Sequence, residues 1–221
     1  LVQRTIIERK DMIVVNNVIE LKRLINQRIE EQGPNCDLND IDVRRLTDMS
    51  FLFSNSPFTG DISKWDTSNV KNMYGMFEYS VFNGDISGWN VSRVENMLRM
   101  FSLSSFNGDI SKWDVSSVKN MNFMFNSSQF NGDIGSWNVG RVEDMGFMFS
   151  SSQFTGDLSK WDVSKVENMA GVFSDSKFDG DLSKWDVSRV RSMNLMFARS
   201  PFKGDLSKWD VSNVRTMSYM F

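Results

Sequence analysis

The chain has 221 residues, of which 40% are hydrophobic, and a formal net charge of −3 at pH 7. This charge argues against nucleic acid as a partner, and the absence of histidine removes the commonest general base and transition-metal ligand. The one cysteine, Cys36, has no partner for an intrachain disulfide. No apolar run reaches the ~18 residues that a membrane-spanning helix needs.

The first predicted element is a helix from Val18 to Ile29. Asn16 or Asn17 can cap its start, and Gly33-Pro34 would end it. One face of this helix is apolar and carries Val18, Leu21, Ile25 and Ile29. Because a repeat array needs a cap over its first exposed edge, the sequence predicts an N-terminal cap over residues 1–36.

A repeat of 24 residues fills the rest of the chain. The motif Gly-Asp-(Ile/Leu)-x-x-Trp occurs seven times, from Gly60 to Gly204, and uses all seven tryptophans. A fixed period of this length is typical of a solenoid, in which each unit packs only against its neighbours. Residues 37–221 are therefore predicted to be a repeat solenoid, with one degenerate unit before about seven regular ones.

Each unit is predicted to contain a strand, a turn and a short helix, which makes the fold an α/β solenoid. Phe58, Gly60 and Ile62 alternate as in a short strand. Val70, Met73 and Phe77 then have the spacing of a helix face, which predicts a helix over residues 69–77. Stacked strands would form a parallel sheet.

The repeated Trp, Phe, Val and Met columns are interpreted first as core. The alternative is an exposed Trp ladder that stacks on sugar rings. The Asp column, from Asp61 to Asp205, is interpreted as a set of turn residues that accept backbone N–H bonds. Its alternative is a calcium-binding column, for which one Asp per edge offers few oxygens.

Charged residues recur on the predicted helix face. One column alternates in sign and then turns basic, and a second, mostly basic column lies beside it. The first contains Lys71, Glu95, Lys119, Glu143, Glu167, Arg191 and Arg215, and the second contains Arg93, Arg141, Lys165 and Arg189. The default interpretation is a solvated surface.

The most variable column of the repeat is the candidate binding site. It reads Phe51, Gly75, Arg99, Phe123, Phe147, Gly171, Leu195 and Tyr219. On a helix with Val70 and Phe77 inward this position points outward, so Phe123 and Phe147 would be neighbours on the surface. The predicted partner-binding residues are Arg99, Phe123, Phe147, Leu195 and Tyr219. Partial burial of this column against the next unit is the alternative.

No enzyme motif is present: the chain has no phosphate-binding glycine loop, no Gly-x-Ser-x-Gly and no Cys/His metal spacing. We therefore predict no catalytic, cofactor-binding or metal-binding residues and no cofactor.

The repeated phrase Phe-Asn-Gly-Asp-Ile-Ser-x-Trp-Asn/Asp-Val-Ser-x-Val-x-Asn-Met-x-x-Met-Phe, nearly complete in residues 106–125 and 130–149, resembles the repeat of the BspA-like leucine-rich-repeat surface proteins of bacteria. The resemblance extends from about Leu21 to the end. It implies a non-enzymatic α/β solenoid at the cell surface or secreted, linked to adhesion to host or matrix proteins. The chain begins without Met or a signal peptide and stops at Phe221, so both ends are expected to be truncation points, and a cytoplasmic location stays open.

The leading hypothesis is a protein-interaction or adhesion module that presents the variable face of a rigid rod to a protein or another host or matrix macromolecule. Two alternatives remain at this point. One is a carbohydrate-binding or calcium-dependent adhesin that uses the Trp or Asp columns, and the other is a purely structural spacer.

Overall fold

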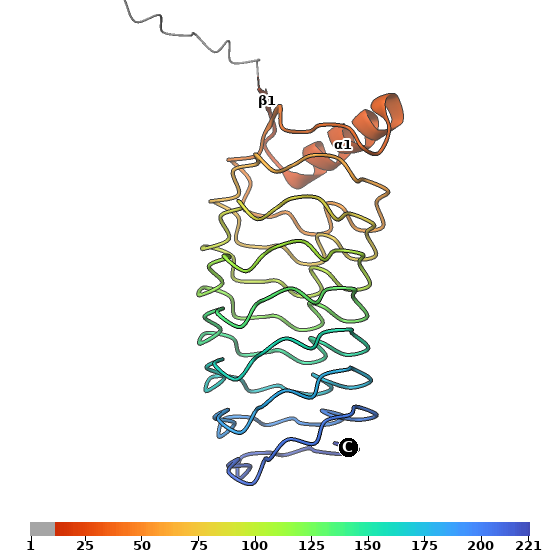
Figure 1. Cartoon of the computed structure of the whole chain (residues 1–221). Coiled ribbons are helices and arrows are strands. Elements are labelled where there is room, and N and C mark those ends of the chain that lie inside the picture. Colours follow the sequence, from red (N-terminus) through yellow and green to blue (C-terminus); the bar gives the residue numbers. More distant parts are fainter. Residues whose placement is uncertain (1–11) are drawn as a thin grey trace, which may run out of the picture.

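Residues 12–221 form a stack of coils with a single helix packed over its N-terminal end (Figure 1). The computed structural model describes residues 12–221. Its named elements are β1 (Ile13–Val14), α1 (Val18–Gln32) and β2 (Ile41–Asp42). β1 and β2 pair in parallel, with Ile13 opposite Ile41, so the segment before the helix is tied to the first coil.

The predicted N-terminal helix is confirmed and ends three residues later than expected. The Asn17 side chain caps α1 by accepting a 2.9 Å hydrogen bond from the Glu20 N–H. Gly33 ends the helix with φ of 90°, a conformation that suits glycine. Leu21 and Ile25 are buried, and the helix covers the first coil as a cap would. Residues 1–11 of the predicted cap lie outside the described residues.

The repeats stack as expected of a repeat protein, but the predicted short helix is wrong. In the unit that contains residues 97–104, the backbone forms a ribbon of consecutive tight turns. The N–H groups of residues 100, 102 and 104 donate to the carbonyls three residues earlier, at 3.1–3.3 Å. The N–H groups of residues 97, 99, 101 and 103 donate to carbonyls of the next coil, at 2.8–2.9 Å.

This ribbon satisfies the backbone as completely as a helix would. The one remaining N–H of the segment, that of Leu98, donates to the Asn96 side chain at 3.0 Å. Half of these hydrogen bonds lie within the turns of one coil, and the other half join that coil to the next. Since buried backbone groups must be paired, the neighbouring coils are part of the local structure, and an isolated unit has no equivalent set of partners.

The turn ribbon explains why its sequence imitates a helix. In residues 97–104 the side chains that are buried belong to Met97, Met100, Phe101 and Ser104, together with Ser102. The first four of these have the spacing i, i+3, i+4 and i+7, which is also the spacing of a helix face. The hydrophobic pattern alone therefore cannot separate the two conformations.

The predicted strand around Phe58–Ile62 is also wrong. Within residues 12–221 that part of the first regular repeat takes part in only one isolated bridge, between Asp37 and Asp61. Parallel bridges instead run through the segment that was predicted to be helical. They join Asp48, Asn72, Asn96, Asn120, Asp144, Asn168, Ser192 and Thr216 in order.

The core is a set of ring columns that runs the length of the stack. Each tryptophan is at most 9% exposed, and its indole N–H donates to a backbone carbonyl of the preceding coil at 2.9–3.1 Å. Phe101 stacks on Phe77 and Phe125 with centroid distances of 5.6 and 5.7 Å. The interpretation of the repeated aromatic columns as core is confirmed.

Candidate functional site: the variable face

The variable column has an unusual backbone. Arg99, Phe123, Phe147, Leu195 and Tyr219 all have φ between 54° and 61°. Each of them is the third residue of a four-residue turn, as Arg99 is in the turn closed by the Met100 N–H and the Met97 carbonyl. A positive φ at this position favours glycine or asparagine. Holding a bulky residue in this region costs roughly 1–3 kcal/mol. The five predicted partner-binding residues thus all lie at left-handed positions of the ribbon.

Two coils have glycine at this backbone position, which is the residue that a positive φ favours. Gly75 and Gly171 occupy the same column with φ of 58° and 60°. At the other positions of the column a large side chain is kept in spite of the strain. Strain of this kind is concentrated at functional sites.

Three of the five predicted residues form a continuous stack across neighbouring coils. The rings of Phe123 and Phe147 lie 4.9 Å apart between centroids, with an angle of 11° between their planes. The Arg99 guanidinium lies over the Phe123 ring, with its central carbon 5.1 Å from the centroid. We call Arg99, Phe123 and Phe147 the aromatic ridge. Both phenylalanines are half-buried, so each predicted alternative, surface anchor and partial burial, describes part of what is observed.

Glu78 and Gly171 mark the two ends of the ridge. The Glu78 carboxylate forms an ion pair with Arg99, with 3.3 Å between Glu78 Oε1 and Arg99 Nη1. At the other end the Phe147 ring covers Gly171, since a Cβ on this glycine would lie 2.2 Å from Phe147 Cε1. The ridge therefore depends on a glycine in the next coil.

Leu195 and Tyr219 are not part of the ridge. They follow Gly171 in the same column and lie on adjacent coils. The Leu195 N–H donates to the Ser218 carbonyl of the next coil at 2.9 Å. Leu195 is 36% exposed and Tyr219 is 80% exposed. The structure thus places all five predicted residues in one column and brings only three of them together.

A hollow of about 320 Å³ opens beside the ridge. Arg99 and Phe123 form part of its wall, together with Tyr74, Leu98, Asn120, Asn122 and Asp144. The Asn122 amide donates to Asp144 at 2.9 Å. The hollow therefore combines apolar walls with amide and carboxylate groups, a mixture that suits a protein side chain.

Sequence reasoning missed a second variable column, four residues after the first. It has the same left-handed backbone and contains Asn55, Tyr79, Leu103, Ser127, Ser151, Asp175 and Arg199. Tyr79 and Leu103 are 54% and 40% exposed on adjacent coils, and Val81 beside them is 52% exposed. The signal was present, because this column varies as much as the first, but it lies just after the segment predicted to be a helix and outside the columns compared above.

The Asp column has the turn role that was expected. Asp109 Oδ1 accepts the Ser111 N–H at 2.9 Å, and the other members of the column accept the equivalent N–H. This backbone bond, followed by the serine side-chain bond, lowers the pKa of Asp109 below its ordinary value. Asp114, which follows Trp113 and belongs to a second column in which Asp alternates with Asn, behaves alike: it accepts the Ser116 N–H at 3.1 Å, and bonds from Ser116 lower its pKa.

Residues 12–221 contain no group of three or more Cys, Asp or Glu side chains arranged to hold a metal ion. The only helix among them, α1, is neither long nor apolar enough to cross a membrane.

Comparison with known proteins identifies one family. Residues 19–129, 102–176 and 151–221 match the family described as Mycoplasma protein of unknown function, DUF285. No curated protein and no solved structure matches the chain. The overlapping matches support a repeat family, and together they cover the whole array.

Proposed function

The chain belongs to the DUF285 family of Mycoplasma proteins of unknown function, and we propose that it is a non-enzymatic protein-interaction module. In this proposal the stack of coils is a solenoid scaffold, related to the leucine-rich-repeat surface proteins that its repeat resembles. The aromatic ridge and the hollow beside it contact a protein on the host cell or in its matrix. The cell surface is the location that this role requires.

The observation that carries the proposal is the retention of large side chains at a backbone position that favours glycine. Phe123 and Phe147 have φ of 56° and 54°, whereas glycine occupies the same position at residues 75 and 171. Packing alone does not give a full reason to keep two phenylalanines there, because the rings are only half-buried. A contact made by their exposed faces does, since aromatic residues and arginine are enriched among residues that dominate binding energy.

The chemistry of the ridge supports a protein partner. Stacked rings give a flat apolar surface, and Arg99 adds donors at one end while Asp144 and Asn122 add acceptors in the hollow. An apolar centre with a polar rim is the usual anatomy of a protein–protein interface.

The alternative functions have less support. A Trp ladder that binds sugars needs exposed indole faces, and every tryptophan is buried. A calcium column needs several oxygens around each ion, and one carboxylate oxygen of each of Asp61, Asp85 and Asp109 already accepts a turn N–H. A pure spacer would not need the strained phenylalanines.

Affinity capture from a matrix extract tests the proposal. The chain, the double variant Phe123→Ser/Phe147→Ser and a control double variant, Ile19→Ser/Val211→Ser, are immobilised at equal density. The control removes two exposed apolar side chains outside the ridge. We expect at least one protein to be retained by the chain and by the control, and to be absent from the ridge variant.

Two results would contradict the proposal. If the same proteins are retained by all three, the ridge is not the contact site. If nothing is retained by the unaltered chain from extracts of several host tissues, the spacer function is favoured.

A further inference from the structure

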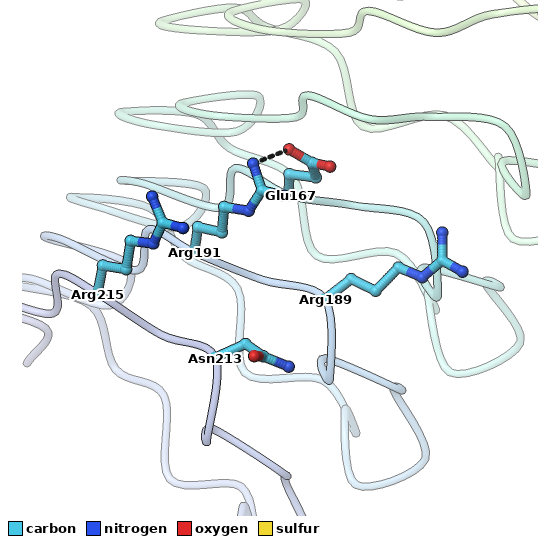
Figure 2. Close-up of a pocket in the computed structure, with 5 residues that line it drawn as sticks. All are labelled: Glu167, Arg189, Arg191, Asn213 and Arg215. Atoms are coloured by element: carbon cyan, nitrogen blue, oxygen red, sulfur yellow. Dashed lines mark ion pairs between the residues drawn. The ribbon is translucent and has the colours of Figure 1, made fainter.

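A basic hollow lies near the last described coils, in the charged columns and outside the ridge. Its volume is about 360 Å³, and it is lined by Glu167, Arg189, Arg191, Asn213 and Arg215. Figure 2 shows the side chains of Arg191 and Arg215 alongside each other, with Arg189 on the far side of Asn213. Three arginines and one glutamate thus line the hollow, and only Arg191 is paired with the carboxylate, since the Arg189 side chain in Figure 2 points away from Glu167.

The column that contains Arg191 and Arg215 departs from the pattern set earlier in the array. Opposite charges alternate on adjacent coils from Lys71 to Glu143, as in the 2.8 Å ion pair between Lys119 and Glu95, and a second carboxylate, Glu167, then follows Glu143. Arg191 resumes the alternation with a 2.9 Å ion pair to Glu167. Arg215 then follows in register, with its N–H bonded to the Arg191 carbonyl at 2.8 Å, so a cation is placed beside a cation.

This arrangement leaves positive charge uncompensated within the described part of the chain. Neither Arg189 nor Arg215 has an ion pair or a side-chain hydrogen bond to residues 12–221, and Arg191 uses only one of its donors for Glu167. Like charges directly opposite each other on adjacent strands are destabilising. A bound anion would remove the repulsion and use the free donors.

We propose that this hollow binds a tetrahedral oxyanion, a phosphate or sulfate group, through the guanidinium groups of Arg189, Arg191 and Arg215. Guanidinium groups donate pairs of hydrogen bonds to such oxygens. An oxyanion of charge near −2 balances three arginines and one glutamate, whereas a single carboxylate leaves a positive charge. The site is independent of the aromatic ridge and of the protein partner proposed above.

Isothermal titration at low ionic strength tests the site, with inorganic phosphate, inorganic sulfate and acetate as probes at matched ionic strength. Phosphate or sulfate should bind, and acetate should bind at least about tenfold more weakly. Stronger binding of one tetrahedral probe indicates which ester the site recognises. Equal binding of acetate, or no binding of either tetrahedral probe, would overturn the proposal.

Matched variants separate this site from the general field of the protein. Arg215→Gln should weaken binding at least about tenfold, the loss expected for charge-assisted hydrogen bonds. Arg93→Gln removes the same charge from an upstream coil, and Phe123→Ser alters the ridge; both should leave binding unchanged. Glu167→Gln should strengthen binding, because it removes a negative charge and frees Arg191. An equal loss of affinity in Arg215→Gln and Arg93→Gln would show that the anion responds to the overall electrostatic field of the protein and that no specific site exists.

The pH dependence distinguishes the two oxyanions. Phosphate loses negative charge below its second pKa, near 6, so its affinity should fall between pH 7.5 and pH 5.5. Sulfate keeps its charge, so its affinity should stay constant over the same range. A fall in sulfate affinity would contradict a site made of arginines alone, since their charge does not change there.

Discussion

The rings of Phe123 and Phe147 lie on adjacent coils, 4.9 Å apart and nearly parallel, at backbone positions where the same array elsewhere uses glycine. This pair separates two classes of aromatic residue in the chain. The buried phenylalanines and tryptophans hold the coils together. The ridge phenylalanines add little that the fold needs.

The ridge should tolerate substitution far better than the core. Phe123→Ser/Phe147→Ser should lower the free energy of unfolding by no more than about 1–2 kcal/mol, because both side chains are only half-buried. Phe125→Ala should lower it by about 3–5 kcal/mol, because this ring is fully buried. Denaturant unfolding followed by circular dichroism measures both. Equal losses would show that the ridge is part of the core.

Each tryptophan should contribute both packing and a hydrogen bond. Trp113 is 4% exposed, and its indole N–H donates to the Ile86 carbonyl at 3.1 Å. Trp113→Ala should destabilise the array by about 3–5 kcal/mol. Trp113→Phe keeps most of the ring and removes one of the two donors to the Ile86 carbonyl, which also accepts the Trp89 N–H at 3.1 Å, so a loss of about 0.5–1.5 kcal/mol is expected. A loss below about 1 kcal/mol in the alanine variant would contradict burial of the column.

Gly171 should be required for both backbone and ridge. A Cβ there would meet the Phe147 ring, and its φ is 60°. Gly171→Ala should therefore cost at least about 1–2 kcal/mol from the left-handed backbone, with a further cost from the displaced ring. In a Phe147→Ser background that further cost should disappear, which a double-mutant cycle measures.

Gly88→Ala is the control for this substitution. A Cβ at Gly88 meets no atom within 4 Å, so the variant should be as stable as the unaltered chain or slightly more stable. If Gly171→Ala is equally harmless, the contact between Phe147 and Gly171 does not constrain the ridge.

Acid should weaken the array through its turn aspartates. The pKa of Asp114 is lowered in the folded state, first by the Ser116 side-chain bond and then by the Ser116 N–H. A lowered folded-state pKa means that the carboxylate stabilises the fold fully above its ordinary pKa of 3.8, and that this contribution is lost as the pH falls below that value. Melting temperatures measured from pH 7 to pH 2 should therefore drop most steeply below about pH 4.

The natural repeats supply the matched variant for this test. Asn90 and Asn138 occupy the equivalent position and accept the same backbone N–H bonds, at 3.1 Å each. Asp114→Asn should thus keep the turn at pH 7 and reduce the drop in melting temperature at low pH. An unchanged acid profile would mean that Asp114 does not take part in the pH dependence.

The sequence predicted the repeat, the capping helix and the buried columns, because each depends on residues that recur at a fixed period. It could not predict the turn ribbon. Met97, Met100, Phe101 and Ser104 have the same inward spacing as a helix face, and what decides between the two is the hydrogen bonding to the next coil. Those hydrogen bonds run between coils, so the hydrophobic pattern of a single repeat does not predict them.

The candidate site was predicted in part. Comparing repeats singled out the column of Arg99, Phe123 and Phe147, because its residue type varies while the core stays constant. The second exposed column, with Tyr79 and Leu103, was missed because it lies just after the segment predicted to be a helix and outside the columns compared. Its outward direction follows from the left-handed residues of the ribbon, which were unknown until the fold was seen.

The most direct test of the central claim is the Kd of a captured partner for the chain, for Phe123→Ser/Phe147→Ser and for Ile19→Ser/Val211→Ser. If the ridge is the contact, the ridge variant should bind at least about 30-fold more weakly, the loss expected from one dominant aromatic residue, while the control variant binds as the unaltered chain does. Equal Kd values for all three folded proteins would contradict the claim that the ridge is the binding surface.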